Sequence, residues 1–151
     1  MKVKFLSVQM KTALLDSSVW ISYFAKDKHF IKAQIILEKI SKYKLNILLP
    51  VIVYVEFLNV LNRLSFTQEE SEKVKQLFKR TEKIKIICAE LSFWTNDVEK
   101  YIQTVKLKSS DLIILAHCFE YKVDEFHTFD QRLYQEYLNL TYENTNPQNG
   151  T

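Results

Sequence analysis

Short apolar runs recur along the chain, and segments with helical periodicity separate them. The runs cover residues 12–16, 44–49, 84–88 and 125–128, and residues 139–142 could add a fifth. Continuous apolar runs are typical of strands that are buried on both faces, whereas strands with one solvent face alternate apolar and polar residues. Because strands alternate with helices, we predict an α/β fold: a three-layer α/β/α sandwich with a parallel sheet of four to five strands.

The segments between the runs carry the spacing and the start signals of helices. Helices are predicted over residues 17–24, 29–43, 51–65, 67–81, 90–106, 111–121 and 131–138. Thr67 and Glu70 match a capping box. Serines are expected to cap two further helices, at Ser17 or Ser18 and at Ser109 or Ser110. Helical spacing predicts that the buried residues include Ile31, Ile35, Ile36, Ile40, Phe93, Val98, Ile102 and Val105.

Length and composition favour one folded domain. A chain of 151 residues suits a single core, here over residues 12–142, with residues 1–11 as an extension and residues 143–151 as a disordered tail. The longest apolar stretch, residues 47–58, contains Pro50 and is too short to cross a bilayer. The first residues lack the sustained apolar segment of a signal peptide. We therefore expect a cytoplasmic protein with no membrane partner.

Glycine is almost absent from the sequence. The single glycine, Gly150, lies in the predicted tail, which excludes every glycine-rich phosphate-binding loop. Neither of the two cysteines belongs to a CxxC or Cys/His cluster, which argues against a zinc site. The net charge of +3 suits a polyanionic partner without requiring one. If the protein handles phosphates, it does so with side chains or metal ions.

Four acidic residues occupy positions that suggest a site. Asp16 and Asp130 follow the first and fourth predicted strands, and ligands of open parallel sheets bind beyond the carboxyl ends of the strands. Glu56 interrupts an otherwise apolar helix, so it either points into a crevice or is costly to bury. Asp111 opens another helix. In a parallel sheet the strand-end acids and Asp111 share one rim.

Each acid also has a structural explanation. Asp16 and Asp130 could cap the helices that follow them, Asp111 could interact with its helix dipole, and Glu56 could lie at a solvent edge. The occurrence of all four acids at such positions favours a site. Neighbouring carboxylates repel one another, and a hard cation such as Mg²⁺ or Mn²⁺, which prefers oxygen ligands, would relieve the repulsion. Such a metal keeps water ligands, one of which can attack a phosphodiester. The four acids therefore predict metal-assisted phosphodiester hydrolysis.

The sequence around these acids resembles that of the PIN-domain family. Leu15-Asp16-Ser17-Ser18 is similar to the opening motif of the family, and Val55-Glu56-Phe57 is similar to its second acidic position. Residues 111–116 (DLIILA) resemble its third motif, and residues 127–130 (HTFD) resemble its final T-x-D. The order, the spacing and the expected elements match over residues 12–142.

The resemblance implies a metal-dependent ribonuclease. It implies that Mg²⁺ or Mn²⁺ binds to Asp16, Glu56, Asp111 and Asp130, and that Ser18 and Thr128 support the site by hydrogen bonding. A compact one-domain chain looks most like the VapC toxins of toxin–antitoxin pairs. That likeness implies an endoribonuclease that cuts RNA, a VapB-like antitoxin as partner and a homodimer.

Other interpretations remain open at this stage. A PIN-like module could bind RNA or protein without cutting, although the intact acid set argues against it, and a housekeeping RNA-processing nuclease would carry the same residues. A response-regulator receiver is disfavoured because no acid ends the third strand. Trp20 and Tyr23 could stack on a base or pack in the core. The basic stretch at 73–85 could contact RNA, although its interleaved glutamates favour a solvated helix face.

Overall fold

The computed structural model describes residues 10–146 and contains a parallel sheet of four strands. The strands are β1 (Thr12–Leu15), β2 (Asn46–Pro50), β3 (Ile84–Ile87) and β4 (Glu125–His127), in the order β3-β2-β1-β4. Leu14 of β1 pairs with Leu48 of β2 on one side and with Phe126 of β4 on the other. The predicted parallel sheet is confirmed.

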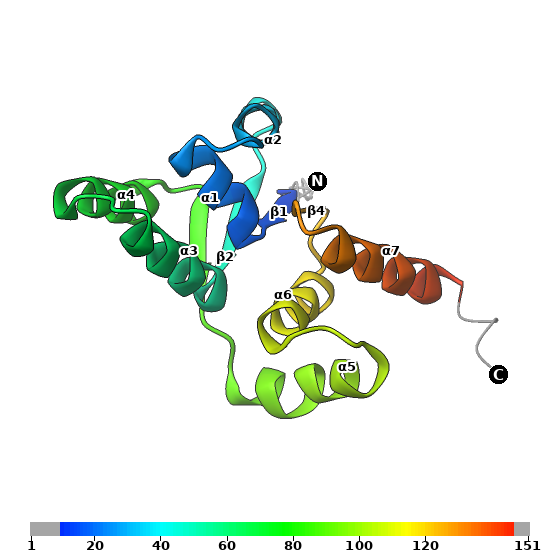
Figure 1. The fold of residues 1–151 in the computed structure, drawn as a ribbon. Helices are drawn as coiled ribbons and strands as arrows, with labels where there is room; N and C mark the ends of the chain where they lie inside the picture. The colour runs from blue at the N-terminus through cyan, green and yellow to red at the C-terminus, as the bar shows by residue number, and fades with distance from the viewer. Residues whose placement is uncertain (1–9, 147–151) are drawn as a thin grey trace, which may run out of the picture.

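Helices connect the strands and cover both faces of the sheet. They are α1 (Ser17–Ala25), α2 (Phe30–Lys42), α3 (Val51–Arg63), α4 (Gln68–Arg80), the π-helical segment η1 (Phe93–Asp97), α5 (Val98–Thr104), α6 (Ser109–Glu120) and α7 (Gln131–Thr145). Because parallel crossovers are right-handed, the connections that step from β1 to β2 to β3 cover one face, and the connection that returns to β4 covers the other. α7 packs on α6, and Figure 1 shows α1–α4 grouped apart from α5–α7. This is the predicted α/β/α sandwich.

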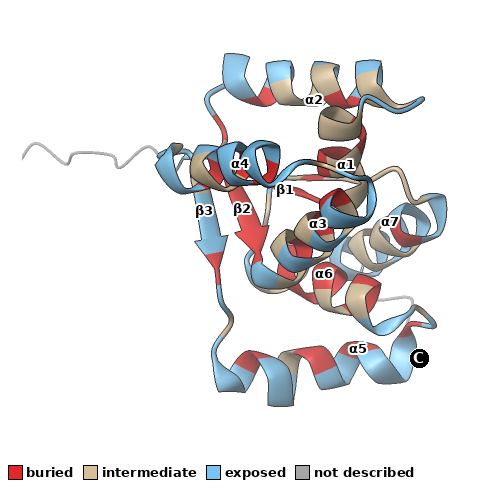
Figure 2. Ribbon diagram, turned by 60° about the vertical axis from the view of Figure 1, so that its left-hand side comes forward, coloured by how far each residue is buried: buried red, intermediate tan, exposed pale blue. Residues whose placement is uncertain are grey.

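The main core joins the sheet to α1–α4 and also includes buried residues of α6 and α7. On α3, Val53, Phe57 and Leu61 recur every fourth residue and are at most 1% exposed. Through these three residues, one face of the helix packs against the sheet. Phe78 of α4 packs edge-on against Phe57 and against Trp20 of α1. Figure 2 shows the buried positions on β2 and on the inner faces of the helices. The packing fixes the position of α3 and the direction of its other side chains.

The prediction of a fifth strand at residues 139–142 is wrong, because α7 continues through it to Thr145. Leu133, Tyr137 and Leu140 recur at helical spacing and pack against the core, so burial of one face stabilises the whole helix. The predicted disordered tail, residues 143–151, therefore begins within a helix. Residues 147–151 of that tail and residues 1–9 of the predicted extension lie outside the described residues.

Two predicted helix caps differ in the structure, while the capping box of Thr67 is confirmed. Asp16, and not one of the serines after it, caps α1 by accepting from the backbone N–H groups of Ser17 and Ser18. An aspartate competes well with serine at this position because it offers two acceptor oxygens. Lys108 precedes α6 with no side-chain cap. No helix within residues 10–146 is long and apolar enough to cross a membrane.

The apolar faces of α2 and α5 are narrower than predicted. Ile31, Ile35 and Ile102 are 63%, 59% and 62% exposed. Ala33 is fully buried in α2 and Tyr101 is buried in α5. In each helix the apolar residues form a stripe that is wider than the surface in contact with the core. Periodicity alone does not show which edge of this stripe is buried.

Candidate active site

The carboxyl ends of β1 and β4 lie together where the chain reverses its direction across the sheet. From β1 the chain proceeds to β2 and β3, and it then returns to β4 on the other side of β1. The backbone N–H of Asp16 donates to the carbonyl oxygen of His127 at 2.9 Å, which ties the two strand ends together. Ligands of open α/β sheets bind at such a reversal point. Asp16 and Asp130 lie there, where the sequence predicted them.

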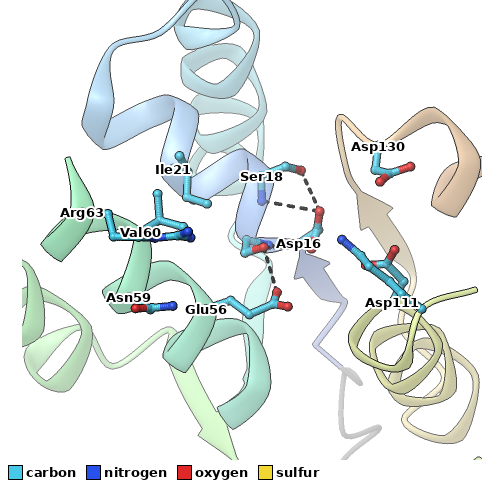
Figure 3. Close-up of a pocket in the computed structure, with 11 residues that line it drawn as sticks. Asp16, Ser18, Ile21, Glu56, Asn59, Val60, Arg63, Asp111 and Asp130 are labelled. Carbon is cyan, nitrogen blue, oxygen red and sulfur yellow. Dashed lines mark hydrogen bonds and ion pairs between the residues drawn. The ribbon is translucent and has the colours of Figure 1, made fainter.

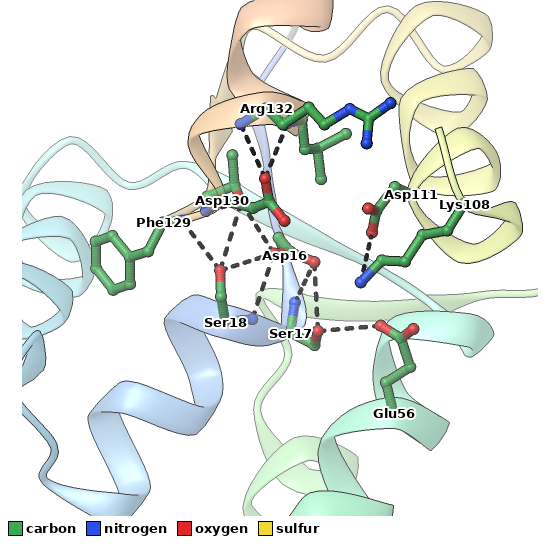
Figure 4. Close-up of polar contacts among 11 residues, drawn as sticks. Asp16, Ser17, Ser18, Glu56, Lys108, Asp111, Phe129, Asp130 and Arg132 are labelled. Atoms are coloured by element: carbon green, nitrogen blue, oxygen red, sulfur yellow. Dashed lines mark hydrogen bonds and ion pairs between the residues drawn. The ribbon is translucent and has the colours of Figure 1, made fainter. Parts of the chain in front are cut away.

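Asp16 is 5% exposed and is surrounded by hydrogen-bond donors. Its Oδ1 accepts from the backbone N–H of Ser17 at 2.7 Å, and its Oδ2 accepts from the hydroxyl groups of Ser18 at 2.7 Å and Thr128 at 2.9 Å. The backbone N–H of Phe129 donates to the Ser18 hydroxyl at 3.0 Å (Figure 4). Donors from both strand ends thus hold the carboxylate in one orientation. Ser18 and Thr128, predicted to support the site, both contact Asp16.

The hydroxyl group of Ser17 connects Asp16 with Glu56. It lies 3.0 Å from Oε2 of Glu56 and 3.3 Å from Oδ1 of Asp16. Glu56 projects from α3 away from the face that carries the buried Val53 and Phe57. The core side of the helix therefore directs Glu56 to the rim of the sheet, where Figure 3 shows it beside Asp16.

Asp111 lies in the first turn of α6 and is 8% exposed. Burial raises the pKa of its carboxyl group above the ordinary value, Lys108 acts in the opposite direction, and repulsion from Asp130 and Asp16 adds to the rise. The Nζ atom of Lys108 lies 3.5 Å from Oδ1 of Asp111. The Lys108 side chain is 68% exposed, so solvent weakens this ion pair. Asp111 therefore lies close to other negative charges, and one exposed lysine partly offsets them.

Asp130 combines a structural role with a place at the rim. Its Oδ1 accepts from the backbone N–H groups of Arg132 at 2.9 Å and Leu133 at 3.0 Å, which caps α7. Its own N–H donates to the Thr128 hydroxyl at 3.0 Å. Among residues 10–146, its Oδ2 has no hydrogen-bond partner. The cap thus uses one oxygen and leaves the other beside the remaining acids (Figure 4).

The four acids line one pocket of about 360 Å³. Its possible metal donors are all oxygen atoms, the ligands that Mg²⁺ and Mn²⁺ prefer. In the described part of the chain, no three Asp, Glu, His or Cys side chains are grouped so as to hold a metal ion. The residues therefore fit a divalent cation by their chemistry, while their carboxylates line the pocket without forming a compact ligand cluster.

Several residues that line the pocket were missed as site residues by the sequence reasoning. Asn59 and Arg63 follow Glu56 by three and seven positions, so helical spacing from Glu56 is the signal that identifies them. Lys108 precedes Asp111 by three positions, outside the helix, and no comparable pattern marks it. Ser17 was expected only as a cap.

The structure bears on two features that the sequence analysis considered for RNA binding. Trp20 is 3% exposed and packs against Phe78, so it belongs to the core. On α4, Lys73 pairs with Glu69 at 2.6 Å, one turn earlier, and the pair is largely exposed. Such pairs are typical of a solvated helix face.

Comparison with known proteins identifies one family. The family model of the PIN domain matches residues 13–137, a range that includes all four acids. Among solved structures, the chain is similar to VapC20 of Mycobacterium tuberculosis, described as a sarcin–ricin loop cleaving toxin. The TM-score is 0.66 and the identity 14%, over 82% of this chain and 94% of that one. No curated protein matches the chain.

Two further solved structures share the fold. VapBC2 from Rickettsia felis, bound to a DNA fragment from its promoter, gives a TM-score of 0.58 at 15% identity, over 82% of this chain and 92% of that one. VapBC-1 from nontypeable Haemophilus influenzae gives 0.56 at 22% identity, over 85% and 93%. Identities this low establish a common fold, and the chemistry of the site rests on its own residues.

Proposed function

The chain belongs to the PIN-domain family, and from that premise we propose that it is a divalent-metal-dependent endoribonuclease that hydrolyses RNA phosphodiesters. The observation that carries the proposal is the gathering of four acids, from separate segments of the chain, around one pocket at the reversal point of the sheet. Individual structural roles account for single acids, such as the cap made by Asp130. They do not account for all four around one pocket.

Asp16 and Asp111 are the main metal ligands in this proposal, because they are the two most buried of the four acids. Glu56 and Asp130 complete the set. Bound Mg²⁺ or Mn²⁺ would supply an activated water and neutralise negative charge on the phosphodiester. One or two ions would satisfy the same set of carboxylates.

The chain's own contribution is to orient these carboxylates before the substrate arrives. The hydroxyl groups of Ser18 and Thr128 donate to one oxygen of Asp16. The hydroxyl group of Ser17 lies between the other oxygen of Asp16 and the carboxylate of Glu56. Hydrogen bonds of this kind fix the direction of a ligating carboxylate, and their loss typically costs roughly 10- to 100-fold in metal affinity or activity. A site with fixed acids also needs little reorganisation during reaction.

We further propose that the protein is the toxin of a toxin–antitoxin pair, with a VapB-like antitoxin as its partner. The similar solved structures are a VapC toxin and two VapBC assemblies, and the match covers 92–94% of each compared chain. A homodimer and a cytoplasmic location belong to the same proposal.

Cleavage of purified RNA tests the nuclease. The protein, purified free of any bound partner, is incubated with RNA and Mg²⁺ or Mn²⁺, with and without a chelator. Asp16→Asn and the matched change Asp97→Asn, which lies in η1 outside the pocket, are assayed beside it. We expect cutting by the wild-type protein and by Asp97→Asn, and none with chelator or with Asp16→Asn.

Two other outcomes would change the assignment. A folded wild-type protein that binds RNA and cuts none with either metal supports the non-catalytic module. Metal-dependent cutting without growth arrest when the protein is expressed alone in a bacterial host supports a housekeeping nuclease. Growth arrest that requires Asp16 supports the toxin.

A further inference from the structure

One face of α3, polar except for Val60, extends from the acids to the edge of the pocket. Glu56, Asn59, Val60 and Arg63 follow one another at helical spacing, and all four line the same pocket as Asp16. Figure 3 shows the Arg63 side chain reaching from the end of α3 back toward the acids. The pocket therefore extends beyond the carboxylates along a helix that ends in a cation.

Asn59 and Arg63 have no internal partner that explains their position. Neither side chain makes a hydrogen bond or an ion pair with another residue in the part of the chain that the structure describes. The other cation at the pocket, Lys108, is bound to Asp111. A favourable interaction with the helix dipole accounts for an arginine in the last turn of α3, but it does not require the side chain to face this pocket.

The chemistry of these two side chains matches a phosphodiester backbone. A guanidinium group binds phosphate oxygens through paired N–H donors, and an asparagine amide donates to phosphate or sugar oxygens. A helix rises roughly 1.5 Å per residue, so the backbone at position 63 lies about 10 Å along α3 from that at Glu56. This separation leaves space for one phosphate at the acids and another near Arg63.

We propose that Arg63, assisted by Asn59, forms a subsite for the phosphate next to the scissile one, so that the substrate is a strand with at least two consecutive phosphates. The inference rests on the proposed ribonuclease function and deepens it. Because Arg63 binds the neighbouring phosphate and not the reacting one, it binds the strand before and during reaction alike. Its contribution therefore affects substrate affinity more than the rate of the bound complex.

RNA binding in a cleavage-inactive background tests this subsite apart from catalysis. The affinity of Asp16→Asn protein for a short single-stranded RNA is measured by fluorescence anisotropy over a range of salt concentrations, with Arg63→Ala, Arg63→Lys or Arg80→Ala added. Arg80 is a matched control, because it is the last residue of α4 as Arg63 is of α3. Thermal unfolding establishes that each variant is folded.

We expect Arg63→Ala to weaken binding roughly tenfold, as for the loss of a charge-assisted hydrogen bond. The slope of log affinity against log salt should fall by about 0.7, the value for one phosphate contact to a single strand. Arg63→Lys should keep the slope, and Arg80→Ala should keep both the slope and the affinity. With a dinucleoside monophosphate, which has one phosphate, Arg63→Ala should bind as well as its parent.

Equal affinity and slope for the Arg63→Ala and Arg80→Ala proteins overturn the subsite, as does an equal loss on the one-phosphate ligand. The result is separable from the nuclease assay. Arg63-dependent RNA binding by a protein that never cuts would support the subsite and contradict the nuclease function. If the protein cuts RNA with metal and Arg63→Ala leaves the KM unchanged, the nuclease function is supported and the subsite is contradicted.

Discussion

The hydroxyl oxygen of Ser17 lies 3.0 Å from Oε2 of Glu56 and joins the start of α1 to the middle of α3. Ser17→Ala removes this bond and leaves the backbone bonds of the α1 cap in place. We expect a 10- to 100-fold loss of metal affinity or cleavage, as is typical when a group that orients a ligand is removed. The unfolding free energy should change by less than about 1 kcal/mol. Metal titration and denaturant unfolding measure the two effects. A matched Ser109→Ala variant, at the start of α6, should leave metal affinity unchanged, and equal effects of both changes would contradict the role of Ser17.

Two substitutions of Asp130 can distinguish its structural role from its role at the site, because one of its oxygens caps α7. Asparagine is as good a cap as aspartate but is uncharged, whereas alanine is a poor cap. Asp130→Asn should therefore retain stability and lose most cleavage. Asp130→Ala should lose cleavage and also about 1 kcal/mol of unfolding free energy. Urea unfolding beside an RNA cleavage assay distinguishes them. Full cleavage by the asparagine variant would remove Asp130 from the site.

Phe78 tests the packing that fixes α3. It is 1% exposed and contacts Trp20 and Phe57 edge-on. Phe78→Ala should cost about 3–5 kcal/mol of unfolding free energy, because it removes a large buried side chain and leaves a cavity. Leu77→Ala is the control on the same helix, since Leu77 is 48% exposed and its loss should cost much less. Guanidinium unfolding provides both values. Similar losses for the two variants would place Phe78 outside the core.

The buried side chain of His117 should make the unfolding free energy depend on pH. The side chain is 2% exposed, and burial lowers the pKa of its imidazole below the ordinary value of 6.5, although the hydrogen bond to Ile113 acts in the opposite direction. Below about pH 6.5 the unfolded chain then binds a proton that the folded chain does not. Stability attributable to His117 should therefore fall as pH decreases from 6.5 toward the lowered pKa.

The measurement is the unfolding free energy of the wild-type protein and His117→Phe at a series of pH values across this range. The phenylalanine variant should show a shallower fall, because it cannot take up the proton. His29→Phe serves as control for the loss of a histidine, since His29 is partly exposed and packs on Phe129. Identical pH slopes for the wild-type protein and His117→Phe would show that His117 titrates alike in both states.

Much of this fold follows from local pattern. Continuous apolar runs identified the four strands, and the acids at their ends followed from the parallel arrangement that those runs predict. The capping box at Thr67 was read correctly because both of its partners lie within four residues. The fold and the positions of Asp16 and Asp130 were therefore accessible from neighbours in sequence.

The errors arose where distant contacts decide the outcome. The four residues at 139–142 resemble a strand in isolation, yet packing of Leu133 and Tyr137 on the core extends α7 through them. The exposure of Ile31 and Ile102 depends on which edge of a wide apolar stripe meets its neighbour. Arg63 was not predicted as a site residue: helical spacing places it on the same side of α3 as Glu56, and the assembled pocket shows that this part of α3 adjoins the other acids.

The two faces of α3 have a consequence for how a substrate is positioned. Val53, Phe57 and Leu61 secure one face to the sheet, while Glu56 and Arg63 share the pocket on the other. The backbone interval between acid and arginine is set by the rise of a continuous helix and not by the packing of a loop. A single residue inserted between them would swing the arginine by about 100° around the helix and displace it from the acids. In the proposed complex, the covalent geometry of the helix would set the distance between the two phosphates that the acids and Arg63 bind.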